Sequence, residues 1–400
     1  MLDSTPTKIN PTINRILYGL HHYFPISDGY TIRSQFILEY LKKYYQINVV
    51  LLKGQKLNEA IPFFKQKLRR KKFHRALRKT VEREEPQLIH ANSPWEVGQP
   101  ANEIAATFEI PMIYEVRGFW EETKVAQGEI TADSKKYLQL KERETDVIFH
   151  ADHVIAISEG IRDEIIQRGI EPEKISVIPN GIDVNKFTFI PPEEQSLRLV
   201  QKYNLENSKV IGYIGTVRHL EGLHLIIEGF SEILGTIPQL KMLVVGDGPD
   251  LQSLKTLVKQ TGLENYIIFV GNVDHSLIRE YYSVMNLIVL PRISSYVNEI
   301  VSPIKILEAM ALGKVVLGSD VGGIKEVIQN GRNGFLFRKD DLNNFVAKCT
   351  TLLERDQLRI KITHAAREWV EMYRDWQLIL SQYHSIYEKV TRLYYENNIA

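Results

Sequence analysis

One stretch of the sequence, residues 299–328, gathers residue types that could hold an anionic ligand. Ser302 is a good helix N-cap, and Pro303 fits the first helical position, where its missing N–H costs nothing. The apolar spacing that follows predicts a helix closed by a glycine. Lys305 falls in the first turn, where open N–H groups favour an anion. Glu308 lies three residues further on and shares its face. The stretch therefore predicts a phosphate cradle, a cation and a carboxylate in one place.

The same stretch resembles the donor-binding signature of the family 4 glycosyltransferases, which have the GT-B fold. That signature has a glutamate, seven residues, Glu-Ala-Met-Ala and then Gly-Gly-x-x-Glu. Here Glu308 takes the place of the second glutamate, while Ile300 holds the place of the first and Glu299 precedes it. The resemblance implies that Glu308 accepts hydrogen bonds from the ribose of a nucleotide, and Glu299 and Lys305 are candidate catalytic residues. The alternative is an ordinary amphipathic helix of a parallel α/β sheet.

Glycine-containing loops in the second half of the chain fit the rest of a donor nucleotide. The family usually has an arginine where Thr216 stands and a lysine where Glu221 stands, and these two cations hold the donor diphosphate. Lys305 and Arg218 are the candidates to replace them. The alternative has Lys305 as a solvated helix residue paired with Glu308. The predicted donor-binding residues are Gly29, Gly215, Thr216, Arg218, Gly246, Gly248, Gly271, Asn272, Val273, Ser302, Pro303 and Glu308.

The composition excludes several classes of protein. With 50 basic and 49 acidic residues, no overall field favours nucleic acid. The single cysteine, Cys349, excludes a disulfide framework and a multi-cysteine metal site. No Asp-x-Asp pair occurs, so the sequence implies no bound metal. The resemblance implies no cofactor and a UDP- or GDP-linked sugar as the donor substrate. The polar N-terminus resembles no signal peptide and no apolar run is long enough to cross a bilayer, which predicts a cytoplasmic protein.

Short β-branched runs alternate with helical segments along the chain, and the pattern restarts after a polar stretch at residues 191–194. This alternation predicts the α/β class with parallel, doubly wound sheets. The resemblance implies two Rossmann-like domains that face each other across a cleft. The predicted parts are an acceptor-side domain at 1–190, a donor domain at 191–375 and a helix at 376–400 that packs back on the first domain. The helical pattern of that last segment runs from Arg367 to Asn397.

Several strings in the first half resemble a bacterial branch of family 4 that accompanies exopolysaccharide and exosortase systems. They lie at residues 21–34, 89–94 and 114–122. The first string contains Gly29, which permits a tight turn before a helix whose N-terminus can hold an anion. The resemblance therefore extends from about Ile16 to the C-terminal helix.

Arg117 ends the fourth predicted strand, at a position where many members of the family have a histidine close to the transferred sugar. An arginine stays protonated and cannot act as a general base. The resemblance therefore gives Arg117 a role in orienting the donor or stabilising a phosphate. The alternative pairs Arg117 with Glu115 or Glu121 to hold the loop.

A basic run extends from Lys65 to Lys79, with phenylalanine and leucine at intervals. A basic amphipathic helix can lie on an anionic membrane surface, which would place the protein on the inner face of the plasma membrane. The alternative is a helix whose apolar residues pack on the sheet while its charges face solvent.

These patterns and the resemblance together predict a retaining, metal-independent glycosyltransferase that uses a nucleoside-diphosphate sugar. Its acceptor would be a hydroxyl of a glycan or of a lipid-linked intermediate in polysaccharide biosynthesis. A sugar-nucleotide epimerase of the same fold is an alternative that the Glu-Ala-Met-Ala helix disfavours. A sugar-nucleotide-binding regulatory subunit without catalysis is the other alternative, and Thr216 and Glu221 keep it open.

Overall fold

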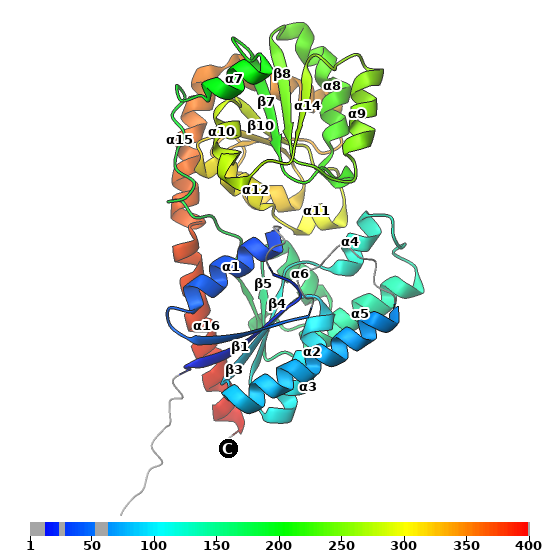
Figure 1. Ribbon diagram of the computed structural model, residues 1–400, viewed down its shortest axis with the longest axis vertical. Helices are drawn as coiled ribbons and strands as arrows, with labels where there is room; N and C mark the ends of the chain where they lie inside the picture. Colours follow the sequence, from blue (N-terminus) through cyan, green and yellow to red (C-terminus); the bar gives the residue numbers. More distant parts are fainter. Residues whose placement is uncertain (1–12, 24–28, 53–62, 399–400) are drawn as a thin grey trace, which may run out of the picture. The chain divides into compact units, whose positions relative to one another are not determined.

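The structure is a computed structural model that describes residues 13–23, 29–52 and 63–398 of the 400-residue chain. It divides into two compact units. Unit 1 contains the chain up to Pro179 together with the segment from Leu378 onward, and unit 2 runs from Asn180 to Gln377. Each unit has one six-stranded sheet in which every strand pair is parallel, with helices packed around it (Figure 1). The α/β class with two parallel sheets is therefore confirmed.

The sheet of unit 1 has the strand order β2-β1-β3-β4-β5-β6. Its strands are β1 (Arg15–Leu20), β2 (Gln46–Leu51), β3 (Leu88–Asn92), β4 (Met112–Val116), β5 (His153–Ala156) and β6 (Ile175–Val177). Its helices are α1 (Gly29–Leu41), α2 (Phe63–Glu84), α3 (Trp95–Phe108), α4 (Trp120–Ala126), α5 (Lys135–His150), α6 (Glu159–Gln167) and α16 (Trp376–Asn398), with a 3-10 turn η1 (Pro172–Lys174). The carboxyl ends of β1 and β4 carry the residues that the sequence marks as functional in this unit.

The sheet of unit 2 has the strand order β12-β11-β10-β7-β8-β9. Its strands are β7 (Lys209–Ile214), β8 (Leu240–Val245), β9 (Ile267–Gly271), β10 (Leu287–Leu290), β11 (Val316–Ser319) and β12 (Phe335–Phe337). Its helices are α7 (Leu197–Tyr203), α8 (Leu223–Thr236), α9 (Leu251–Gln260), α10 (Ile278–Ser283), α11 (Tyr296–Ile300), α12 (Ile304–Ala311), α13 (Gly322–Lys325), α14 (Leu342–Glu354) and α15 (Asp356–Tyr373). The 3-10 turns η2 (His219–Glu221) and η3 (His275–Leu277) follow β7 and β9.

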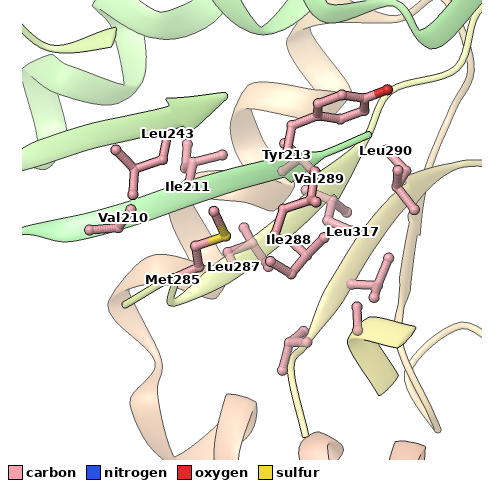
Figure 2. Packing of buried hydrophobic residues seen from close by; sticks show 14 of the residues in the cluster. Val210, Ile211, Tyr213, Leu243, Met285, Leu287, Ile288, Val289, Leu290 and Leu317 are labelled. Atoms are coloured by element: carbon pink, nitrogen blue, oxygen red, sulfur yellow. The ribbon is translucent and has the colours of Figure 1, made fainter. Parts of the chain in front are cut away.

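The core of unit 2 forms around its central strands. All four residues of β10 are buried, because β10 lies between β11 and β7 and has helices on both faces. Figure 2 shows these side chains in one buried cluster with Ile211 and Met285, with Tyr213 toward the end of β7. The Tyr213 ring joins this core, and its hydroxyl points away from the aliphatic side chains toward the loops that follow the strands. The core thus fixes the strand ends from which the candidate site is built.

The predicted single helix over residues 367–397 is wrong, because the chain forms two helices there. α15 ends at Tyr373 and α16 begins at Trp376. At the break, the N–H of Ile182 donates to the carbonyl of Arg374 (2.8 Å) and the N–H of Trp376 donates to the carbonyl of Ile182 (3.1 Å). Backbone groups that a continuous helix would pair internally are therefore satisfied by a neighbouring strand-like segment.

Candidate functional site

The helix α12 begins one residue later than the sequence suggests. Pro303 is the N-cap, with an extended backbone (φ −80°, ψ 131°), and no side chain caps the helix. The predictions of Ser302 as N-cap and Pro303 as first helical residue are therefore wrong. The reason is that α11 ends at Ile300, and the chain must run extended to connect two helices so close in sequence. At the other end Gly313 (φ +72°) stops the helix as predicted.

Lys305 points from the first turn of α12 toward the end of β7. Its Nζ donates to the Glu221 carboxylate (2.8 Å) and to the Tyr213 hydroxyl (2.9 Å). That hydroxyl in turn donates to the carbonyl of Thr216 (2.8 Å). The alternative in which Lys305 pairs with Glu308 in solvent is wrong, because tertiary contacts bring a closer carboxylate to the amine.

Glu221 is shared by two cations. Besides Lys305, Arg292 approaches its carboxylate through Nη2 (3.1 Å) and Nε (3.4 Å). Burial disfavours the charged form of Glu221, but Arg292 and then Lys305 outweigh it and hold its pKa at about 2. Burial lowers the pKa of Lys305, and Glu221 opposes that shift. The three side chains, the Glu221 cluster, form an ion triad with one carboxylate and two cations.

Glycines let the loops after β7 and β8 approach each other and this cluster closely. A Cβ on Gly215 (φ +143°) would lie 2.9 Å from the Lys305 Nζ, and a Cβ on Gly246 would lie 2.0 Å from the carbonyl oxygen of Gly215. A Cβ on Gly248 would lie 2.1 Å from the carbonyl oxygen of Val217. Side chains at these positions would push the loops apart. The structure therefore brings together the predicted glycines that follow β7 and β8.

The loop after β9 joins the same group. The N–H of Gly246 donates to the carbonyl of Gly271 (2.8 Å), and Gly271 has a left-handed backbone (φ +80°) that favours glycine. Asn272, the next residue, is exposed, and Val273 is half-buried. Neighbouring strand ends of unit 2 thus present their loops at one edge of the sheet, where α/β sheets bind ligands.

Glu308 lies on α12 and is half-buried. Among the residues that the structure describes, none donates a hydrogen bond to this carboxylate. Burial raises the pKa of Glu308, while His275 and Lys305 oppose the shift. A half-buried acceptor without a protein donor is suited to a ligand that brings hydroxyl groups.

Glu299, a predicted catalytic residue, is engaged by other residues of unit 2. Its carboxylate accepts a hydrogen bond from the N–H of Gly322 (2.7 Å) at the start of α13. It also forms an ion pair with Lys339 (2.5 Å). Burial opposes the charged form, yet the Lys339 and Gly322 hydrogen bonds hold the pKa of Glu299 below its usual value. Glu299 therefore holds α13 and a neighbouring loop in place, while Glu221 takes the place beside Lys305.

Arg218 and Thr216 lie in the loop after β7 and are exposed, whereas Arg292 is nearly buried. Sequence reasoning missed Arg292. The signal that could have found it is its place directly after the buried strand β10 and Pro291, at the carboxyl end of a central parallel strand.

In unit 1, Arg117 is part of a buried hydrogen-bond network. Its guanidinium donates to Glu115 (2.7 Å), to Ser34 Oγ (2.6 Å) and to the carbonyl of Tyr30 (2.9 Å). Arg33 donates to the same Glu115 (2.9 Å). Burial disfavours the charged form of Glu115, but the two arginines hold its pKa well below the usual range. The structure thus shows the pairing with Glu115 that was the alternative to a catalytic role for Arg117.

Two other parts of unit 1 relate to the predicted site. Gly29 begins α1, and residues 24–28 of the preceding loop lie outside the described part of the chain. The Nδ1 atom of His90 forms a hydrogen bond (2.6 Å) with the hydroxyl of Tyr387 on α16. Burial lowers the pKa of His90. The contact from α16 belongs to unit 1 itself, so this helix completes the first unit.

Within the described ranges, no set of three or more His, Cys, Asp or Glu side chains is arranged to hold a metal ion. Over the same ranges, no helix has both the length and the apolar character to cross a membrane.

Comparison with known proteins gives two family matches that follow each other along the chain. Residues 54–186 match the model described as Glycosyltransferase Family 4, and residues 197–369 match the model described as Glycosyl transferases group 1. The boundary between the matches lies close to that between the two units.

Curated relatives carry glycosyltransferase names. N-acetyl-alpha-D-glucosaminyl L-malate synthase of Bacillus anthracis is 30% identical over 61% of this chain and 61% of its own length. The capsular polysaccharide biosynthesis glycosyltransferase CapM of Staphylococcus aureus is 28% identical over 76% of this chain and 77% of its own length. The chain thus spans about six tenths of the first relative and about three quarters of the second.

Solved structures share the fold over nearly the whole chain. HepE of Anabaena, solved in complex with UDP, aligns with a TM-score of 0.73 at 19% identity over 94% of this chain and 100% of its own. Sucrose-phosphate synthase of Thermosynechococcus elongatus aligns with a TM-score of 0.76 at 18% identity over 94% of this chain and 99% of its own. At these identities the likeness shows the fold, which confirms the predicted GT-B class.

Proposed function

Because the chain belongs to the family 4 glycosyltransferases of the GT-B fold, we propose that it transfers a sugar from a UDP-sugar to a hydroxyl group of an acceptor glycan or lipid-linked glycan. The observation that carries this proposal is the meeting of the glycine loops after β7, β8 and β9 with Lys305 and with the unpaired Glu308. The solved complex of HepE with UDP and glucose supports UDP as the nucleotide. The name of CapM supports a cell-surface polysaccharide as the product.

The donor would bind to unit 2 through its nucleotide. The ribose hydroxyls would donate to the half-buried carboxylate of Glu308, to which no described residue donates. The diphosphate would lie against the loop that contains Gly215, next to the Lys305 amine. The helix N-terminus of α12 adds N–H groups that favour an anion.

During transfer, the bond between the anomeric carbon and the diphosphate oxygen breaks, and a new bond forms to the acceptor oxygen. Negative charge develops on the leaving diphosphate, and Lys305 would stabilise it. We infer retention of configuration, with the proton of the acceptor hydroxyl passing to the departing phosphate on the same face. We also propose that protein cations rather than a divalent metal neutralise this charge, so that transfer should be insensitive to a chelator.

Unit 1 would bind the acceptor, and α2 would bring the protein to an anionic membrane surface. Phe73 and Leu77 of α2 are buried, whereas Lys71, Lys72 and Arg75 are exposed. The contact would therefore be electrostatic, without insertion of these apolar side chains. Sedimentation with anionic vesicles should fall as salt rises, because surface charges are screened over about 10 Å at 0.1 M. Equal sedimentation with neutral and anionic vesicles would rule out this electrostatic contact with the membrane.

A second candidate is a sugar-nucleotide-binding subunit that does not catalyse transfer. Thr216 and Glu221 favour it, because they stand where the family usually has the diphosphate cations. A thermal-shift panel of nucleotides and nucleotide sugars comes first, because a ligand at one hundred times its dissociation constant adds about 2.7 kcal/mol of stability. Radiolabelled transfer to a membrane-lipid extract then separates the two candidates. Binding without transfer would support the second candidate and contradict the first.

A further inference from the structure

Arg292 reaches the Glu221 cluster from the end of β10. Besides its two contacts with Glu221, its Nη1 donates to the carbonyl of Val301 (3.3 Å). Only 11% of its side chain is exposed. An arginine has five N–H donors, and the described residues accept three of them. The guanidinium therefore keeps two donors for another acceptor.

The backbone around Arg292 is built to hold it beside Glu221. The Asn298 side chain donates to the carbonyls of Leu220 and Ile293, both at 2.9 Å, which are the chain neighbours of Glu221 and Arg292. A Cβ on Gly222 would lie 1.9 Å from the carbonyl oxygen of Pro291, so the two segments touch through the backbone. One amide side chain and one glycine thus fix the distance between the loop after β7 and the loop after β10.

The charges of the cluster do not balance within it. Two cations share one carboxylate, and Glu299, on the neighbouring helix α11, is engaged by Lys339 and Gly322. Glu308 lies within electrostatic range of Lys305 but accepts no hydrogen bond from it in the described part of the chain. A nearly buried positive charge with unused donors is stabilised when an anion approaches it. A Cβ on Gly215 would lie 2.9 Å from the Lys305 Nζ, so a diphosphate on the Gly215 loop would lie next to this cluster.

We propose that Arg292 is the second cation of the donor diphosphate site and that Glu221 is a positioning residue that holds Arg292 and Lys305 side by side. The proposal rests on the proposed function, because it assigns residues to the diphosphate of the same donor. It gives Glu221 a reason to be acidic where the family usually has a lysine. It also assigns the second cation to a nearly buried arginine rather than to the exposed Arg218.

The test compares ligands with and without phosphates. Arg292→Gln should weaken UDP binding by about tenfold to a hundredfold, the usual cost of a hydrogen bond to a charged group. Binding of uridine should stay unchanged, because it has no phosphate. Arg292→Lys should fall between the wild type and Arg292→Gln. The matched control is Arg338→Gln, which removes an exposed arginine of the same unit and should leave both ligands unaffected. Calorimetry measures UDP binding, and ligand-observed NMR measures the weaker uridine binding.

The Glu221→Lys variant tests the positioning role of Glu221 independently. If Glu221 is a positioning carboxylate, a lysine there places three cations together and weakens UDP binding without restoring the family pattern. Stronger UDP binding by Glu221→Lys would overturn the proposal. Equal loss of UDP and uridine binding in Arg292→Gln would also overturn it, because that result means general damage. Unchanged UDP affinity in Arg292→Gln would overturn this inference alone, whereas a wild-type protein that binds neither UDP nor GDP would overturn the proposed function as well.

Discussion

At the scale of single residues, the three glutamates of the predicted site and its cluster have three different environments. Glu221 holds two cations, Glu299 holds a helix N-terminus and a lysine, and Glu308 has no protein donor among the described residues. The carboxylate of Glu308 therefore has all of its acceptor sites available for sugar hydroxyls, which is why we assign it to the ribose. The cations, in contrast, retain donors for an anion.

Glu308→Ala tests this assignment. Loss of the charge-assisted hydrogen bonds, worth about 1.5–3 kcal/mol, should weaken UDP binding by about one to two decades in calorimetry. Glu354→Ala, which removes an exposed glutamate of the same unit, is the control. An affinity equal to that of the wild type would remove Glu308 from the nucleotide site.

Arg117→Lys keeps the positive charge of unit 1 but loses the planar fork that contacts both Glu115 and Ser34. We expect a lower melting temperature and a fall in turnover that exceeds any change in UDP affinity, because the nucleotide would bind to unit 2. Turnover and the UDP dissociation constant should be measured on the same preparation. Wild-type turnover in Arg117→Lys would show that the residue has no role in orienting the sugar.

The sequence predicted part of this residue-level arrangement. The spacing of Lys305 and Glu308, and the glycines of the loops, follow from helix and turn rules that act over a few residues. Which carboxylate Lys305 meets is decided by segments far apart in the chain, since Glu221 lies 84 residues away. No local rule contains that information, and the contact between Arg292 and Glu221, which are 71 residues apart, was not predicted for the same reason.

At the scale of elements, the close approach of α11 and α13 explains the Gly-Gly pair of the signature. A Cβ on Gly322 would lie 2.2 Å from the carbonyl oxygen of Glu299, and a Cβ on Gly323 would lie 2.1 Å from that of Val301. The start of α13 therefore packs directly on the backbone that connects α11 to α12. This contact holds the first turn of α12, and with it Lys305, in place.

Gly323→Ala should disturb this contact. Overpacking of this kind costs about 1–3 kcal/mol, so we expect a lower melting temperature and weaker UDP binding. Gly235→Ala is the matched control, because Gly235 lies on α8 with open space around its Cβ position. There alanine should raise the free energy of unfolding by about 0.5–1 kcal/mol through its helix propensity. A Gly323→Ala protein as stable as the wild type would contradict the packing role.

The packing of α5 on β4 contains a pH-sensitive group. Glu144 accepts hydrogen bonds from the Tyr114 hydroxyl (2.6 Å) and from the N–H of Trp95 (2.7 Å). Burial, and secondarily the charge of Glu121, raise the pKa of Glu144 from 4.5 to about 8. In the pH window between these two pKa values, the folded chain holds a proton on Glu144 that the unfolded chain has lost. Stability should therefore fall as pH rises through the window, by up to about 1.4 kcal/mol per pH unit from this group.

Glu144→Gln removes the titrating group and keeps an acceptor for the N–H of Trp95. Urea unfolding at the two ends of the window should show a smaller loss of stability at high pH than in the wild type. Glu142→Gln, an exposed change on the same helix, should leave the wild-type slope intact. An unchanged slope in Glu144→Gln would contradict the assignment.

At the scale of the whole molecule, the element order was predictable because hydrophobic periodicity reflects burial within each sheet. The strand β10, for example, is buried throughout and reads as an uninterrupted apolar run. The break between α15 and α16 was not predictable, because the backbone groups at Arg374 and Trp376 are satisfied by Ile182, which is distant in sequence. All three residues of the Glu221 cluster, Glu221, Arg292 and Lys305, lie within unit 2.

The most direct test of the account is the rate of sugar transfer by Lys305→Ala, measured with radiolabelled UDP-sugars on a membrane-lipid extract. Removing a group that stabilises developing charge commonly costs about two to three decades in turnover. We therefore expect transfer to be nearly abolished while the fold, followed by circular dichroism, remains intact. Lys255→Ala, an exposed lysine on α9, should transfer at the wild-type rate. Transfer by Lys305→Ala at the wild-type rate would contradict the account.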